Sequence, residues 1–246
     1  MDNPFSLIDK TILITGASSG IGRVCALICA DAGAKLIITG RNKERLFQTF
    51  NSLSGTGHKM VIANLTNESN RQVLVDSIDD VNGVILNAGI NDKSLIKFLK
   101  PEFVDNMMQI NFSANVMLIQ GLLRKKKLVN GCSIILTSSV SAFYPTISNA
   151  VYGASKAALV QFARVLAKEV KPQNIRVNTI APAMVETQML QAYTLQDKID
   201  EMRAKNINGR FISPEEVAYA CLYLLSDAAQ MITGINMVID GGYTLQ

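Results

Sequence analysis

Short apolar runs alternate with longer amphipathic stretches along almost the whole chain. The apolar runs are rich in Val, Ile and Leu and are nearly continuous, which is typical of parallel strands buried on both faces. These predicted strands cover residues 11–15, 35–39, 59–63, 83–87, 133–138, 175–180 and 236–240. Helical spacing of apolar residues is clearest in the intervening stretches 21–32, 103–124, 153–170 and 214–226.

The alternation of strands and helices predicts an α/β fold. We expect a single-domain, doubly wound (Rossmann-type) parallel sheet of about seven strands, flanked by helices on both faces. No linker or low-complexity stretch divides the sequence, so residues 1–246 are predicted to form one domain. The segment 184–210 is polar with scattered methionines and has no strand pattern, so we interpret it as an insertion that covers a site.

Charge and composition narrow the choice of partners. The net charge of +4 is mild, and Lys and Arg are scattered, so the sequence gives no support to a nucleic-acid partner. The one dense basic run, Arg124–Lys127, follows a helical pattern, and solvated cations at a helix end explain it better than a partner-binding patch. No apolar run is long enough to span a membrane, and the N-terminus lacks the layout of a signal peptide.

The cysteines and the single histidine argue against metal and disulfide chemistry. Cys25, Cys29, Cys132 and Cys221 have spacings that suit neither a zinc site nor a disulfide framework. With His58 as the one histidine, we predict no metal site. Together with the absence of a membrane segment, this predicts a reduced, cytoplasmic protein.

A glycine-rich turn joins the first predicted strand to the first predicted helix. Gly16, Gly20 and Gly22 stand where the strand ends and the helix begins. Glycines there permit positive φ angles and let the backbone approach a pyrophosphate, whose charge the free N–H groups of the helix favour. Glycine also ends strands for structural reasons alone, but the position after the first strand favours a dinucleotide site.

The end of the second predicted strand bears on which dinucleotide binds. A site for NAD usually places Asp or Glu here on the ribose 2′-hydroxyl, whereas this chain has Gly40 and Arg41. A guanidinium can hold a 2′-phosphate by charge-assisted hydrogen bonds, and Lys43 and Arg45 can add positive potential. We therefore predict NADP(H) in preference to NAD(H); the alternative is a surface arginine at a strand end.

At this point the chain resembles the short-chain dehydrogenase/reductase family almost from end to end. An ordered set of motifs carries the resemblance: Thr15-Gly16-x-x-x-Gly20-x-Gly22, Asn87-Ala88-Gly89, Asn111, Ser139, Tyr152-x-x-x-Lys156, Pro182, Thr187 and Asp240-Gly241-Gly242. A member of this family is expected to have one dinucleotide-binding and catalytic domain, which agrees with the domain predicted from the pattern.

The resemblance implies a catalytic tetrad of Asn111, Ser139, Tyr152 and Lys156. Tyr152 takes the role of general acid when a carbonyl is reduced, and Lys156, one helical turn away, supplies a cation that is expected to lower the pKa of the phenol. Ser139 is expected to hydrogen-bond the substrate oxygen. Asn111 is similar to the family's fourth member, which interrupts a helix and holds a water in a proton relay. Each residue alone also fits an ordinary polar position.

The other motif residues resemble the family's cofactor contacts. Asn87 and Gly89 are expected near the adenosine ribose and the centre of the sheet, Thr187 near the carboxamide or diphosphate, and Val185 near the nicotinamide. Ser19 departs from many NADP-dependent members, which carry Arg or Lys there, so Arg41 has less help. The complete predicted cofactor set is Gly16, Ser18, Ser19, Gly20, Ile21, Gly22, Arg41, Asn64, Leu65, Asn87, Ala88, Gly89, Tyr152, Lys156, Pro182, Val185 and Thr187.

Within the family the chain is most like 3-oxoacyl-acyl-carrier-protein reductases, although sugar, steroid and alcohol dehydrogenases share the same motifs. The resemblance implies an NADP(H)-dependent reductase of a small-molecule ketone, for which a carrier-protein-bound acyl thioester is one candidate, and a homotetramer. An acidic carrier would need cations near the site mouth, for which Lys125, Lys126, Lys127 and Lys171 are candidates. The alternatives are a dehydrogenase of alicyclic or sugar alcohols and a non-catalytic NADP(H) sensor.

Overall fold

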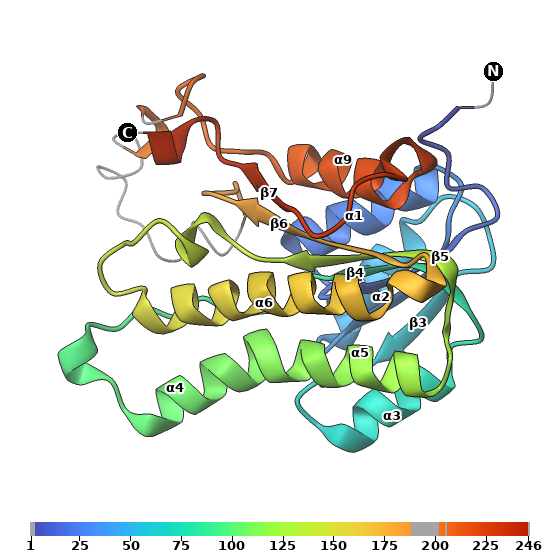
Figure 1. Ribbon diagram of the computed structural model, residues 1–246, viewed down its shortest axis with the longest axis horizontal. Helices are drawn as coiled ribbons and strands as arrows, with labels where there is room; N and C mark the ends of the chain where they lie inside the picture. Colours follow the sequence, from blue (N-terminus) through green and yellow to red (C-terminus); the bar gives the residue numbers. More distant parts are fainter. Residues whose placement is uncertain (1–2, 188–201, 205, 246) are drawn as a thin grey trace.

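A seven-stranded, wholly parallel sheet forms the centre of the computed structural model, which describes residues 3–187, 202–204 and 206–245 (Figure 1). The strands lie in the order β3-β2-β1-β4-β5-β6-β7. This confirms the predicted doubly wound sheet. The strands are β1 (Thr11–Thr15), β2 (Lys35–Gly40), β3 (Lys59–Ile62), β4 (Val81–Leu86), β5 (Leu128–Thr137), β6 (Arg176–Pro182) and β7 (Asn236–Ile239).

Helices cover both faces of the sheet (Figure 1). On one face lie α1 (Gly20–Asp31), α2 (Lys43–Asn51) and α9 (Pro214–Leu225). On the other lie α3 (Glu68–Asp76), α4 (Pro101–Met108), α5 (Ala114–Arg124) and α6 (Ala150–Glu169). None of the helices in these described parts of the chain is long and apolar enough to cross a membrane.

The strands are apolar because the sheet separates two cores. In β1, Ile12 and Ile14 pack into the core beneath α1 and α9, whereas Leu13 points to the core beneath α3, α5 and α6. All three side chains are fully buried. Burying each of them stabilises the fold by about 1.5–3 kcal/mol, so consecutive apolar residues are favoured. This explains the nearly continuous apolar runs in the sequence.

The strand order reverses between β1 and β4, and this places a crevice at the carboxyl edge of the sheet. The two strand ends are tied together there: the Thr15 hydroxyl oxygen accepts the backbone N–H groups of Asn87 at 3.0 Å and Ala88 at 3.1 Å. The glycine turn and the Asn87-Ala88-Gly89 motif therefore meet at one point, although they are far apart in the sequence.

The predicted helix over 103–124 is interrupted. It consists of α4, a π-helical turn Gln109–Ser113 and α5, with Asn111 inside the turn. Strand β5 begins at Leu128, before the predicted residue 133, because Leu128 pairs with Val81 across a register shift. Helices α2 and α3 were not among the predicted helices, since few of their residues are buried and their apolar stripes are narrow.

The basic run Lys125–Lys127 lies at the opposite edge of the sheet from the crevice. It precedes the amino end of β5, and the strand separates it from the carboxyl end at Thr137, roughly 20 Å away, because Leu128 to Leu136 runs alongside only Val81 to Leu86. Lys125 forms an ion pair with Asp76 at 3.4 Å. Lys171 also precedes a strand, β6, rather than following one. These lysines therefore do not surround the mouth of the predicted site, and the solvated-cation interpretation is the better one.

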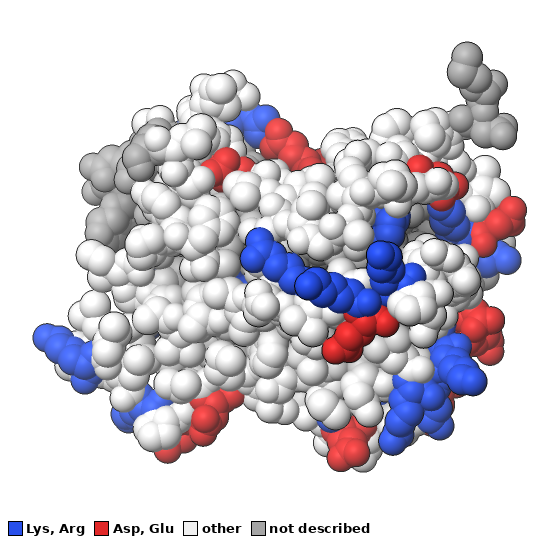
Figure 2. Space-filling view, viewed as in Figure 1, with Lys and Arg blue, Asp and Glu red and all other residues white. Residues whose placement is uncertain are grey.

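The first halves of α5 and α6 present a surface that is poor in charge, whereas charged side chains gather over the second half of α6 (Figure 2). Over the first halves of both helices, Figure 2 shows a surface without Lys, Arg, Asp or Glu. Met117 on α5 and Val165 on α6 are both exposed hydrophobic residues. An area of this kind is suited to contact with another protein surface.

The predicted covering segment 184–210 is only partly described, because residues 188–201 and 205 lie outside the described residues. Its two ends are joined: Val185 bridges to Ile212, the N–H of Glu186 donates to the Ile212 carbonyl at 2.8 Å, and the N–H of Ile212 donates to the Met184 carbonyl at 3.1 Å. The covering role stays a prediction.

Candidate active site

The glycine turn has the geometry that its residues predict. Gly16 and Gly20 adopt φ angles of +67° and +53°, a region that favours glycine. A Cβ atom on Gly22 would run into the Gly16 carbonyl oxygen and lie 2.7 Å from Asn87 Nδ2. Ser19 precedes α1 without capping it through its side chain, and the first turn carries no acidic residue. The N–H groups that begin α1 are therefore suited to bind an anion.

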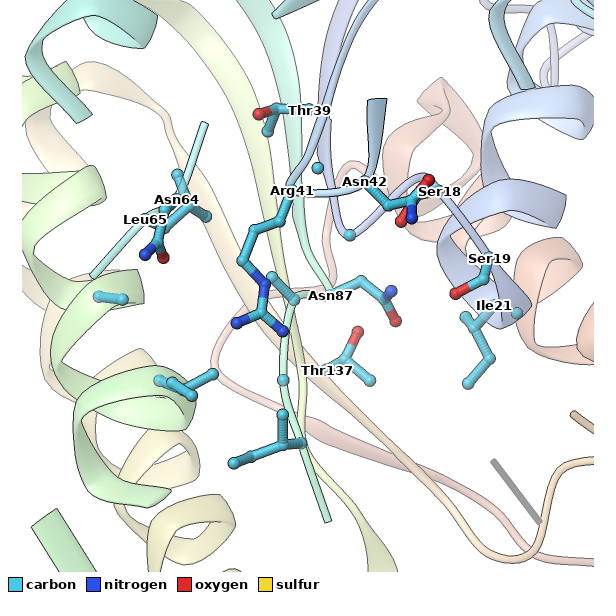
Figure 3. Close-up of a pocket in the computed structure, with 18 of the residues that line it drawn as sticks. Ser18, Ser19, Ile21, Thr39, Arg41, Asn42, Asn64, Leu65, Asn87 and Thr137 are labelled. Carbon is cyan, nitrogen blue, oxygen red and sulfur yellow. The ribbon is translucent and has the colours of Figure 1, made fainter. Parts of the chain in front are cut away.

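A cavity of about 650 Å³ follows the carboxyl edge of the sheet past this turn (Figure 3). The ends of β1, β2, β3 and β4 and parts of α5 and α6 contribute to its walls. Most of the predicted cofactor residues line it: Gly16, Ser18, Ser19, Gly20, Ile21, Arg41, Asn64, Leu65, Asn87, Ala88, Gly89, Tyr152, Lys156 and Thr187.

Three predicted cofactor residues do not line the cavity. Gly22 lies behind the turn, where its lack of a side chain permits the close packing described above. The carbonyl oxygen of Pro182 lies 3.4 Å from Ser139 Oγ, and Val185 bridges to Ile212. Their contact with a cofactor therefore stays a prediction.

Positively charged side chains line the end of the cavity that lies next to β2 and β3. Arg41 extends between Asn64 and Leu65 on one side and Ser18 and Asn42 on the other (Figure 3). Arg45 also lines the cavity, and its backbone N–H donates to Asn42 Oδ1 at 2.8 Å, which begins α2. No acidic residue lines the cavity in the described part of the chain.

At the other end, Tyr152 and Lys156 enter the cavity from the first turns of α6. Lys156 Nζ donates to the Thr137 carbonyl at 2.7 Å and lies 5.7 Å from the centroid of the Tyr152 ring. The Lys156 side chain is buried, and this burial lowers its pKa from 10.5 to about 8. Desolvation penalises the charged ammonium, so Lys156 begins to lose its proton only slightly above neutral pH.

The phenol of Tyr152 has a raised pKa, contrary to the expectation that Lys156 would lower it. Burial raises the pKa, and a hydrogen bond with the Ser139 side chain offsets part of this increase. Desolvation is the larger effect because the phenolate would lose its hydration. Tyr152 is therefore protonated at neutral pH, which is the form that a proton donor requires.

Ser139 and Asn111 take different places around this pair. Ser139 Oγ accepts the N–H of Ser141 at 3.2 Å and shares a hydrogen bond with Tyr152. Asn111 is fully buried in the π-helical turn, so the predicted helix interruption is present. Its Oδ1 accepts the N–H of Ile90 at 2.8 Å, and its Nδ2 donates to the Ile90 carbonyl at 2.9 Å.

Asn111 and Lys156 both lie close to Gly89. A Cβ on Gly89 would lie 3.0 Å from Asn111 Oδ1 and 3.4 Å from Lys156 Nζ, so a side chain there would crowd both. The structure thus brings Tyr152, Lys156 and Ser139 together and places Asn111 behind Gly89. The proton relay through a water stays a prediction.

Several residues of the cavity have no place in the motifs. They are Thr39, Gly40, Asn42, Ala63, Thr66, Ile90, Asn91, Ile110, Ala114 and Thr137. Most lie at the carboxyl end of a predicted strand or within four residues after it, and this position is the one sequence signal that could have found them. The glycine cradle and the uncapped helix N-terminus fit the pyrophosphate of a dinucleotide.

Comparison with known proteins agrees with this geometry. The family model described as Enoyl-(Acyl carrier protein) reductase matches residues 16–244. The chain therefore belongs to the short-chain dehydrogenase/reductase family of oxidoreductases, whose members bind a nicotinamide cofactor. Within the described residues, no group of three His, Cys, Asp or Glu side chains is placed to hold a metal ion.

Individual relatives cover nearly the whole chain. A 3-oxoacyl-[acyl-carrier-protein] reductase of Thermotoga maritima is 34% identical over 96% of this chain and 98% of its own length. The NAD-dependent glycerol dehydrogenase of Listeria innocua is 31% identical over 100% and 98%. The structure of a candidate NAD(P)-dependent gluconate 5-dehydrogenase of Beutenbergia cavernae, with NADP bound at low occupancy, aligns with a TM-score of 0.89 at 28% identity over 99% and 100%.

Proposed function

We propose that the protein is an NADP(H)-dependent carbonyl reductase that converts a ketone to a secondary alcohol. The observation that carries the proposal is the meeting of the Tyr152 phenol, the Ser139 hydroxyl and the Lys156 ammonium at one end of a cavity whose other parts fit a dinucleotide. A sensor has no need for such a group of proton donors, whereas a reductase does.

Each residue has a distinct part in the proposed reaction. Tyr152, protonated because its pKa is raised, donates its proton to the carbonyl oxygen of the substrate. Ser139 donates a hydrogen bond to the same oxygen and stabilises the developing alkoxide. Lys156 stabilises the phenolate that remains and orients the cofactor through its ribose. The bound nicotinamide supplies the hydride for the carbonyl carbon.

The preference for NADP(H) is proposed on the charge of the adenosine end. Arg41 and Arg45 both line that end, and their guanidinium groups can share the 2′-phosphate. Arg45 thus supplies a second cation, since this chain has Ser19 where many NADP-dependent members carry Arg or Lys. An Arg41→Ala variant should weaken NADPH binding about tenfold or more and leave NADH binding nearly unchanged, since a hydrogen bond to a charged group contributes about 1.5–3 kcal/mol.

For the substrate, we propose a 3-oxoacyl thioester, with an alicyclic ketone or keto-sugar as the alternative. The reductase of Thermotoga maritima supports the first, and the candidate gluconate 5-dehydrogenase of Beutenbergia cavernae supports a keto-sugar. A carrier protein, if it delivers the substrate, would have to dock elsewhere than on Lys125–Lys127, because that run lies at the far edge of the sheet.

The test is NADPH oxidation with acetoacetyl-coenzyme A, followed by absorbance, with Tyr152→Phe as the control. Turnover that the substitution abolishes would support both the reductase activity and Tyr152 as its acid. Binding of NADPH without turnover of this thioester would direct the search to alicyclic ketones and keto-sugars. Turnover that survives in Tyr152→Phe would refute the proposed mechanism.

We also propose a homotetramer in which α5 and α6 form a contact between subunits. The uncharged surface over the first halves of both helices, with Met117 exposed on α5, supports this interface (Figure 2), as does Val165, which is exposed in the second half of α6. Light scattering after size-exclusion chromatography measures the mass directly. A Val165→Glu variant should dissociate to smaller species if this surface is the contact, and a monomeric wild type would refute it.

A further inference from the structure

Three consecutive residues at the end of β5 contact the two reactive residues of α6. The Thr137 carbonyl accepts Lys156 Nζ at 2.7 Å, and the Ser139 hydroxyl is close enough to the Tyr152 phenol to lower its pKa. Between them, Ser138 Oγ donates to the backbone carbonyl of Lys156 at 3.0 Å. Ser138 belongs to none of the sequence motifs and does not line the cavity.

Ser138 is itself held in a fixed position. Its backbone N–H donates to the Ile180 carbonyl at 2.7 Å, which extends the pairing of β5 with β6 by one residue. The residue is almost fully buried, with 1% of its surface exposed. Because its backbone is fixed to the sheet, the Ser138 hydroxyl connects the sheet firmly to α6. Ser138 also directly precedes Ser139 in the chain.

The approach of α6 to this strand end is close and leaves little space for a shift. A Cβ on Gly153 would lie 2.5 Å from the Ser141 carbonyl oxygen, so the first turn of α6 packs directly on the loop that follows Ser139. A small movement of α6 relative to β5 would change the distance between the Ser139 hydroxyl and the Tyr152 phenol. In a reacting group, a misplacement of about 1 Å can reduce the rate about 100-fold.

We propose that Ser138 is a positioning residue for the reaction, which sets the placement of Tyr152 and Lys156 against Ser139 through its hydrogen bond to the Lys156 carbonyl. The inference rests on the proposed function, since it takes Tyr152 and Ser139 to be the groups that act on the substrate. Ser138 touches neither the cavity nor the phenol, so it acts through α6 alone.

The same strand supplies a matched control. Ser133 lies within β5, which Ser138 directly follows, and is 1% exposed; its hydroxyl donates to the Leu224 carbonyl of α9 at 2.8 Å. Both serines therefore join β5 to a helix carbonyl by one buried hydrogen bond. They differ in the helix they hold, because α9 lies on the opposite face of the sheet from α6. Ser138→Ala and Ser133→Ala should lower the midpoint of urea unfolding by similar amounts.

The first measurement is the ionisation of Tyr152, followed by phenolate absorbance as the pH is raised, with Tyr152→Phe as the blank. Because the Ser139 side chain lowers the pKa of Tyr152, a loosened contact should move its titration to higher pH in Ser138→Ala. Ser133→Ala should titrate like the wild type. This readout needs neither cofactor nor substrate.

The second measurement is the steady-state reduction of acetoacetyl-coenzyme A by NADPH. Ser138→Ala should lose about 10- to 100-fold in kcat while its KM for NADPH stays within about twofold, and Ser133→Ala should keep the wild-type kcat. Ser138→Thr, which retains the hydroxyl, should recover most of the rate. Ser138→Cys fills nearly the same volume with a weak donor and should behave like Ser138→Ala.

The outcomes separate this inference from the proposed function. Equal Tyr152 titrations in Ser138→Ala and Ser133→Ala would overturn the positioning role even if the protein is a reductase. Wild-type behaviour of Ser138→Cys would overturn it as well, because volume alone would then matter. If the Tyr152 titration shifts in Ser138→Ala but the wild type does not reduce acetoacetyl-coenzyme A, Ser138 still positions Tyr152. The proposed reaction would then be refuted on its own.

Discussion

Replacement of Lys156 by Met should make the stability of the fold less dependent on pH. In the native protein, burial lowers the pKa of Lys156 from 10.5 to about 8, which corresponds to about 3 kcal/mol of destabilisation while the side chain is charged. Below pH 8 both the folded and the unfolded chain carry the proton, and the full penalty applies. Between about pH 8 and pH 10.5 the unfolded chain binds more protons, so the wild type gains stability as the pH rises.

The Met side chain keeps the apolar stem but has no charge to desolvate. It also leaves the Thr137 carbonyl without its partner, which costs about 1–3 kcal/mol at every pH. The informative quantity is therefore the difference in unfolding free energy between variant and wild type, measured by urea titration at pH 7 and pH 9.5. This difference should move in favour of the wild type by about 2 kcal/mol over that range. A difference that does not change with pH would refute the desolvation argument.

Three further substitutions test other parts of the structure. Gly22→Ala should weaken NADPH binding more than tenfold in a fluorescence titration, because its Cβ would displace the Gly16 carbonyl and Asn87; unchanged affinity would contradict the close packing of the turn. Asn111→Ala should lower the unfolding free energy by about 2–4 kcal/mol, because the backbone N–H and carbonyl of Ile90 lose their partners; a loss below about 1 kcal/mol would argue that water replaces them. Ser213→Ala removes half of a capping box with Glu216 at the start of α9 and should cost about 1 kcal/mol in urea unfolding, with no effect on NADPH affinity.

The strands and the glycine turn could be predicted because their signals are local. Ile12, Leu13 and Ile14 are apolar in succession since a core lies on each face, and the sequence alone carries that information. The family resemblance then predicted a set of cofactor residues, and the structure places most of them around one cavity.

Other features depend on partners far along the chain and could not be predicted. Helical periodicity runs through residues 109–113, so the interruption at Asn111 was expected from the family resemblance alone, and the bonds of Asn111 with Ile90 are visible only in the structure. The expected lowering of the Tyr152 pKa was wrong because the argument counted the cation but not the burial. The hydrogen bond from Ser138 to the Lys156 carbonyl likewise has a backbone partner, and backbone carbonyls have no sequence signature.

The cavity also links the folding of distant parts of the chain. Its walls come from positions between Gly16 and Thr187, and the contact between Thr15 and Asn87 joins two strands that the chain reaches at different times. The cavity is therefore completed only when long-range contacts across the β1–β4 junction have formed, which are slow to form during folding. A dinucleotide that binds only the completed cavity would stabilise the fold by about 2.7 kcal/mol at a concentration of 100 times its Kd. In a cell, the supply of the cofactor would then help to set how much of the newly made protein survives.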